Sequence, residues 1–155
     1  VMAHVYAARA LVPDMIRRGG GYLVNVASGA SLLCQIGDAA YSTTKSAALG
    51  FAESLAITHG DDGIKVSVVC PLYVETRMTE GGRGISGSDR VMSADEVADA
   101  VIEGMTAERF LILPHQEVAK YAQRKVDDYD RWLLGMRRMR EGMLQKNPQF
   151  AYKVS

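Results

Sequence analysis

The sequence predicts an α/β protein whose parallel sheet has helices on both faces. Three short segments are almost wholly apolar, and none of them alternates apolar with polar residues. Strands buried on both faces have this composition, whereas strands with one face in water alternate. Helical segments separate the three strands, which is the pattern of β-α-β units. We therefore expect one layer of parallel strands between two layers of helices.

The first helix and the first strand are expected at the beginning of the chain. Apolar side chains recur every three or four residues over 1–18, which is the period of a helix. Gly19, Gly20 and Gly21 follow, and glycines commonly end helices because they adopt left-handed backbone conformations. Residues 22–27 then form a short, largely buried strand.

The second helix and the second strand have equally clear boundaries. Asp38 is placed to cap a helix over 39–59, and Gly60 ends it. Small residues are frequent in this helix and permit close packing against a neighbour. Residues 64–70 form the second buried strand, which Pro71 closes.

The last third of the chain predicts two more helices and one strand. Ser93 and Glu96 have the spacing of a capping box at the start of a helix. Residues 110–113 form the third strand, and Pro114 closes it. Over 116–145 apolar residues recur at helical spacing, which predicts one long amphipathic helix. We expect this helix to pack within the fold or at a subunit interface rather than on a membrane.

Composition and charge exclude several classes of function. The 155 residues include 18 basic and 18 acidic ones, so the net charge offers no attraction to nucleic acid or anionic membranes. No apolar run approaches the ~20 residues that cross a bilayer, and the first residues do not resemble a secretory signal, so we expect a cytoplasmic protein. Cys34 and Cys70 have no further cysteines or clustered histidines near them, which predicts two reduced thiols and no metal site.

A phenol and an ammonium occur four residues apart at the start of the second helix. Tyr41 and Lys45 therefore leave the same face of that helix and can act together. A nearby ammonium favours the phenolate form of a tyrosine, so we expect Tyr41 to exchange a proton near neutral pH. Ser28 follows the first strand, and the carboxyl ends of parallel strands form the ligand-binding edge of such sheets. Three polar groups are thus expected to converge at one edge.

These residues resemble the motifs of the short-chain dehydrogenase/reductase family. LVNVAS, which ends at Ser28, resembles the strand-end serine of that family, and YSTTK resembles its YxxxK motif. The resemblance implies an NAD(P)-dependent oxidoreductase that interconverts an alcohol and a ketone or aldehyde. Tyr41 would be the general acid or base, Lys45 would bond the nicotinamide ribose, and Ser28 would polarise the substrate oxygen. The implied fold is the C-terminal half of a doubly wound, Rossmann-like sheet, within a single partial domain over 1–155.

The segment CPLYVET after the second strand resembles the family loop that holds the nicotinamide. The resemblance implies that Pro71, Val74 and Thr76 bind the cofactor together with Tyr41 and Lys45. The choice between NAD and NADP depends on a residue after an earlier strand of the family fold, which this sequence does not include.

The substrate is expected to be a small, apolar alcohol or carbonyl compound. Leu32, Leu33, Ile36 and Tyr73 flank the predicted pocket. The glycine-rich stretch 79–90 is expected to be either a lid over the pocket or a solvated loop.

Two other polar residues occur near the end of the first strand. Ser31 is a rival to Ser28, but it lies further into the loop, so Ser28 is preferred. Asn25 lies within the strand, where a structural hydrogen bond is expected rather than chemistry.

The sequence departs from the family pattern in two places. Leu72 stands where the family usually has a glycine, and the glycine-rich turn that cradles a pyrophosphate does not occur in the sequence. We therefore expect a fragment of a longer enzyme, inactive in isolation, whose helices 1–18 and 39–59 make a homodimer or homotetramer. Two other hypotheses remain open: transient use of the nicotinamide, as in epimerases and dehydratases of the family, and a non-catalytic dimerisation or regulatory module.

Overall fold

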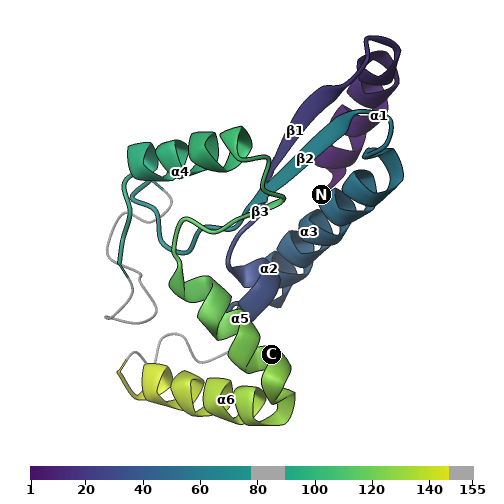
Figure 1. Cartoon of the computed structure of the whole chain (residues 1–155). Coiled ribbons are helices and arrows are strands. Elements are labelled where there is room, and N and C mark those ends of the chain that lie inside the picture. Colours follow the sequence, from purple (N-terminus) through teal and green to yellow (C-terminus); the bar gives the residue numbers. More distant parts are fainter. Residues whose placement is uncertain (78–89, 147–155) are drawn as a thin grey trace.

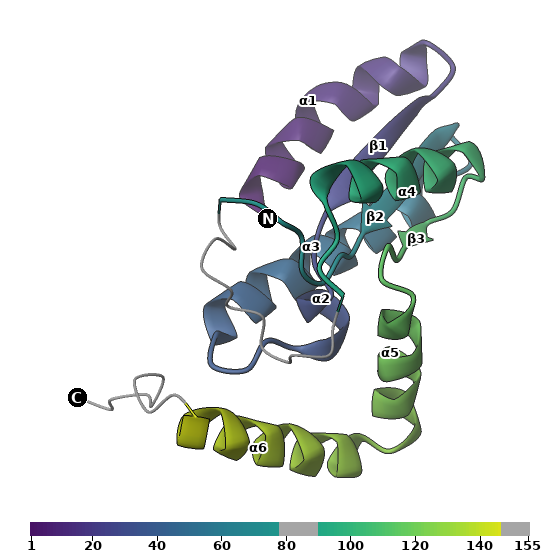
Figure 2. The same cartoon turned by 90° about the vertical axis from the view of Figure 1, so that its left-hand side faces the viewer.

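The computed structural model describes residues 1–77 and 90–146 (Figure 1). The elements in chain order are α1 (Met2–Arg17), β1 (Gly21–Val26), α2 (Ala30–Leu33), α3 (Ala39–His59), β2 (Ile64–Val69), α4 (Ala94–Thr106), β3 (Leu111–Ile112), α5 (Glu117–Asp127) and α6 (Tyr129–Lys146). Within the described residues the strands form one parallel sheet in the order β1-β2-β3. Helices α1 and α3 cover one face of the sheet and α4 covers the other (Figures 1 and 2). The predicted fold class is confirmed.

The main core lies between the sheet and the two helices α1 and α3. Small side chains line both helices where they meet the sheet, and Ala8, Ala48 and Ala52 are all buried. They pack in one cluster with Val66 and Val68 of β2. Small side chains let a helix approach a strand closely, so this packing holds the middle of α3 against β2.

Glycines join the amino ends of β1 and β2. Gly20 has a φ of 135° and Gly63 a φ of 81°, which favour glycine over any other residue. A Cβ atom on Gly20 would lie 2.6 Å from the carbonyl oxygen of Gly63. The Gly21 N–H donates to that same oxygen at 3.1 Å. The glycines that follow α1 therefore also help to fix which residue of β1 lies beside which residue of β2.

The predicted capping box is present at the start of α4. Ser93 Oγ accepts the Glu96 N–H at 3.2 Å, and Glu96 Oε2 accepts the Ser93 N–H at 2.8 Å. The hydrogen bond from the Ser93 backbone lowers the pKa of the Glu96 carboxyl.

A tyrosine of β1 joins α4 to the sheet. The Tyr22 hydroxyl lies 2.8 Å from Ser67 Oγ of β2 and 3.5 Å from the carbonyl oxygen of Met105 in α4.

The C-terminal region differs from the prediction of one helix over 116–145. The structure has two helices there, α5 and α6, and Figure 2 shows α6 turning away from α5. Asp128 separates them with an extended backbone, and its Oδ1 accepts the Arg131 N–H at 2.9 Å. An aspartate in this position caps the start of a new helix. The apolar spacing continues across the break, so the periodicity alone did not reveal it.

The two C-terminal helices differ in how they are attached to the domain. Helix α5 packs on α2, buries Val118 completely, and donates from Lys125 Nζ to the Leu32 carbonyl at 2.6 Å. Helix α6 has no buried residue, and Leu133 and Leu134 are each about half exposed. None of the helices in the described ranges is long and apolar enough to cross a membrane.

Candidate active site

The carboxyl ends of the strands lie level along one edge of the sheet. Val26 of β1 pairs with Val69 of β2, and Val69 pairs in turn with Ile112 of β3. The segments that follow the three strands therefore meet at this edge, where parallel α/β sheets bind ligands. The segment after β1 contains Ser28, and the segment after β2 begins with Cys70 and Pro71.

Ser28 is buried at the turn between β1 and α2. Its Oγ accepts a hydrogen bond from the Ala30 N–H at 3.2 Å, which leaves the hydroxyl proton to point at another oxygen. The next residue, Gly29, donates its N–H to the Pro71 carbonyl at 2.7 Å. A Cβ atom on Gly29 would lie 2.5 Å from Leu72 Cδ2, so glycine allows the two loops to touch. Ser28 is thereby held beside the predicted cofactor loop.

Tyr41 and Lys45 lie in the first turns of α3. Asp38 Oδ1 accepts the Tyr41 N–H at 2.9 Å, so the helix begins just before the tyrosine, as predicted. Lys45 Nζ donates to the Val26 carbonyl at 3.3 Å and lies 5.7 Å from the centre of the Tyr41 ring. The ammonium therefore joins the end of β1 to the tyrosine. An ammonium has three N–H donors, so Lys45 retains donors for a ligand.

The structure also accounts for Ser31, the rival to Ser28. Ser31 Oγ donates to the Lys45 carbonyl at 3.0 Å, and Ser46 Oγ donates to the Ser31 carbonyl at 3.2 Å. These bonds fasten α2 to α3. The hydroxyl proton of Ser31 is used inside the protein, whereas Ser28 keeps its own.

The predicted cofactor loop, residues 71–76, is held from two sides. The Met92 N–H donates to the Tyr73 carbonyl at 3.0 Å, and the Glu75 N–H donates to the Met92 carbonyl at 2.8 Å. Val74 and Met92 thus form a short parallel bridge. On the other side, the Leu72 N–H donates to His115 Nδ1 at 3.2 Å. Leu72 therefore does not prevent an ordered loop, although it replaces the glycine usual at this position.

His115 is the residue of this edge that sequence analysis missed. It is 2% exposed, and its Nε2 lies 3.0 Å from the Arg90 carbonyl. Since Nδ1 accepts from the Leu72 N–H, the neutral ring must donate from Nε2 to Arg90. The signal was the position of His115 directly after β3 and Pro114, at the same strand-end edge as Ser28.

Asn25 corrects one expectation about the first strand. The residue is 7% exposed within β1, and a structural hydrogen bond was expected for its side chain. Its Nδ2 is buried without a hydrogen-bond partner among the described residues.

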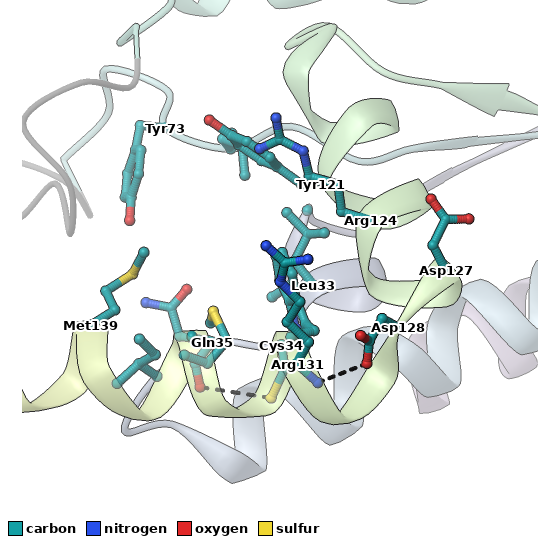
Figure 3. Close-up of a pocket in the computed structure, with 17 residues that line it drawn as sticks. Leu33, Cys34, Gln35, Tyr73, Tyr121, Arg124, Asp127, Asp128, Arg131 and Met139 are labelled. Atoms are coloured by element: carbon teal, nitrogen blue, oxygen red, sulfur yellow. Dashed lines mark hydrogen bonds between the residues drawn. The ribbon is translucent and has the colours of Figure 1, made fainter.

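A hollow of about 770 Å³ opens next to the strand-end edge (Figure 3). It lies between α2, the loop after β2, and helices α5 and α6. Leu33, Ile36 and Tyr73 line it, as expected. Leu32 does not line it and packs against the main core instead. The expected lid over 79–90 lies outside the described residues, except for Arg90.

Comparisons with known proteins agree with this architecture. Residues 1–83 match the family model described as short chain dehydrogenase. The chain is 36% identical over 130 residues to 1-deoxy-11-beta-hydroxypentalenate dehydrogenase of Streptomyces exfoliatus, which covers 81% of this chain and 47% of the relative. It is 43% identical over 72 residues to 2-(R)-hydroxypropyl-CoM dehydrogenase of Xanthobacter autotrophicus, which covers 46% of this chain and 29% of the relative.

The fold is also similar to that of a solved structure. The short-chain dehydrogenase from Sphingobium yanoikuyae in complex with NADPH is similar with a TM-score of 0.65 at 27% identity, over 83% of this chain and 50% of that chain. The chain spans about half the length of the 1-deoxy-11-beta-hydroxypentalenate dehydrogenases that it matches. The resemblance drawn from the sequence motifs is confirmed, and the chain belongs to the short chain dehydrogenase family.

Proposed function

We propose that this chain provides the catalytic edge of an NAD(P)-dependent oxidoreductase that interconverts an alcohol and a ketone or aldehyde. One observation supports the proposal above all others. Lys45 Nζ bonds the carbonyl at the end of β1 and lies 5.7 Å from the Tyr41 ring centre, at the end of the strand that leads to Ser28. A proton donor, a cation and a second hydroxyl are thus available at one edge of the sheet.

Each of the three residues has a distinct role in the proposed reaction. In the reducing direction Tyr41 gives its hydroxyl proton to the substrate oxygen, and in the oxidising direction it takes that proton back. Ser28 donates its hydroxyl proton in a hydrogen bond to the same oxygen and stabilises the charge that develops there. Lys45 holds a ribose hydroxyl with its remaining donors and stabilises the tyrosinate through its positive charge. The hydride belongs to the nicotinamide when the cofactor is bound.

The donor set at this edge fits a nicotinamide nucleoside. Lys45 has N–H donors beyond the one used by Val26, and hydroxyl groups of a ribose accept such bonds. The loop with Pro71, Val74 and Thr76 is fixed by Met92 and His115, so it offers a rigid wall for a planar ring. We propose these residues, with Tyr41 and Lys45, as the cofactor-binding set, and leave NAD and NADP as equal candidates.

The assembly and the setting of the protein are part of the same proposal. We propose that residues 1–155 belong to one nucleotide-binding domain and that α1 and α3 form the contacts of a homodimer or homotetramer. Tyr6 and Leu11 on α1 and Ile57 on α3 are exposed, which supports such a contact. A cytoplasmic setting and small-molecule rather than nucleic-acid partners agree with two free thiols and a net charge of zero.

Replacing Tyr41 by phenylalanine in the intact protein tests the catalytic assignment. General acid-base groups contribute about 10²- to 10⁴-fold, so alcohol-dependent reduction of NAD or NADP should fall by at least about a hundredfold. Tyr129→Phe, which changes an exposed tyrosine at the start of α6 that does not line the hollow, is the matched control and should leave turnover unchanged. Unchanged turnover in Tyr41→Phe would reject the assignment of Tyr41, whereas no alcohol-dependent turnover in the unmodified intact protein would favour a non-catalytic module.

A further inference from the structure

We propose that the hollow beside the strand-end edge selects substrates with an anionic group, such as a carboxylate, at the far end of an apolar body. The inference rests on the proposed function, because it takes the hollow as the substrate site of the same reaction. It adds the chemical class of the substrate, which Ser28, Tyr41 and Lys45 do not determine.

The hollow extends from the catalytic edge to the C-terminal helices. Gly29, the residue after Ser28, and Leu72, in the proposed cofactor loop, line one end of it. Residues of α5 and α6 line the other end. Ser28 does not itself line the hollow, but Gly29 follows it directly in the chain, so a substrate with its reacting oxygen at Ser28 would have room for its remaining part in the hollow, toward α5 and α6.

Two guanidinium groups point into the hollow from its outer end. Arg124 comes from α5 and Arg131 from α6, and Figure 3 shows both side chains directed from their helices toward the space between them. Neither guanidinium forms an ion pair or a hydrogen bond with any residue in 1–77 or 90–146. Guanidinium groups that lack a protein carboxylate favour an anionic ligand, especially a planar carboxylate.

The carboxylates that also line the hollow already have partners. Asp127 Oδ1 accepts from Gln123 Nε2 at 2.7 Å, and Asp128 Oδ1 accepts the Arg131 N–H at the start of α6. In Figure 3 the Asp127 carboxylate points away from the Arg124 guanidinium. These two acids therefore do not neutralise the arginines by direct pairing.

The rest of the outer wall is apolar. Trp132, Met136 and Met139 project from α6, and Leu33 faces them from α2. Methionine side chains adapt to irregular apolar shapes, so this wall suits the hydrocarbon part of a substrate. An apolar body with an anionic end matches both parts of the hollow.

Trp132 provides a direct measure of binding, because it is the single tryptophan of the sequence and lies in the hollow. We would titrate the intact protein with octanoate, octanol and octylamine, which share one chain length and differ in charge. Subtracting the signal of Trp132→Phe isolates the fluorescence of Trp132. Octanoate should bind about fivefold to tenfold more tightly than octanol, and octylamine more weakly than either.

Charge variants then locate the preference. Arg124→Gln and Arg131→Gln should each remove most of the preference for octanoate, and added salt should reduce it in the unmodified protein. Arg138→Gln, which removes an exposed arginine of the same helix that does not line the hollow, is the control and should keep the preference. Equal affinity for octanoate and octanol, or a preference that survives the double Arg124→Gln/Arg131→Gln change, would overturn the inference.

The outcome is separable from that of the proposed function. The titration is repeated in Tyr41→Phe, where the preference for octanoate should persist because Tyr41 does not line the hollow. If Tyr41→Phe keeps full turnover while octanoate is preferred, the catalytic assignment fails and the anion site stands. If turnover is lost while octanoate is not preferred, the anion site fails alone.

Discussion

His115 should determine how well the proposed cofactor loop is held, and its replacement is the most informative change outside the proposed catalytic residues. The ring joins the Leu72 N–H to the Arg90 carbonyl and is almost completely buried. His115→Leu keeps most of the volume and removes both hydrogen bonds. His115→Asn can keep an acceptor near the position of Nδ1 and so preserve the bond to Leu72.

The expected loss of stability depends on what happens to the Leu72 N–H and the Arg90 carbonyl when the imidazole ring is removed. The Leu72 N–H lies on a partly buried residue, and an unpaired buried donor costs about 1–3 kcal/mol. Arg90 is exposed, so water can replace His115 at its carbonyl at little cost. The expected decrease in the free energy of unfolding is therefore about 2 kcal/mol. For a urea m-value of ~2 kcal/mol/M, this decrease lowers the urea midpoint by about 1 M.

Urea unfolding followed by circular dichroism measures this loss, and cofactor titration of the intact protein measures its effect on the site. His115→Leu should raise the Kd for NAD or NADP several-fold, and His115→Asn should recover part of both losses. His59→Leu is the control, because His59 lies at the end of α3, where its Nδ1 lies 3.0 Å from Asp62 Oδ2, and within the described residues it forms no hydrogen bond with the proposed cofactor loop. A cofactor affinity unchanged in His115→Leu, or equal losses in His59→Leu, would refute the positioning role.

Two further predictions concern ionisable groups. Hydrogen bonding lowers the pKa of Glu96, so its contribution to the free energy of unfolding is present above its unfolded pKa and is lost as the pH falls through the lower folded pKa. The stability difference between the wild type and Glu96→Gln should therefore shrink on acidification below pH ~4 in urea titrations, and a constant difference would contradict the capping contact. Burial raises the pKa of the Cys70 thiol, whereas Cys34 is exposed, so a thiol reagent at neutral pH should modify Cys34 first and Cys70 only on unfolding. Equal labelling rates in the folded protein would show that Cys70 is accessible.

Much of the fold could be predicted because local rules and tertiary packing agree along most of the chain. Asp38, the glycines at 19–21 and the Ser93–Glu96 box each end or begin an element where the sequence places them. The break at Asp128 could not be found in this way. Its apolar neighbours keep helical spacing on both sides, and the hydrogen bond that the Arg131 N–H donates to Asp128 Oδ1 marks the start of a second helix there.

The candidate site likewise has residues that the sequence predicted and residues that it did not. Ser28, Tyr41 and Lys45 are recognisable because strand ends and helical spacing place them at one edge. His115 and the two arginines of the hollow are far from that motif in sequence, and their roles depend on the tertiary positions of α5, α6 and the segment after β3. Asn25 shows the converse, since a polar residue in a buried strand was expected to find a partner and its Nδ2 has none in the described part of the chain.

The central claim is that Tyr41 and Lys45 act as one catalytic unit at the end of β1. A double-mutant cycle of Tyr41→Phe and Lys45→Met on kcat/KM for alcohol oxidation tests it most directly in the intact protein. Residues that act as a unit lose activity non-additively, so the double variant should be little worse than the more damaging single variant. Losses that multiply independently, or single variants that retain wild-type kcat/KM, would contradict the account.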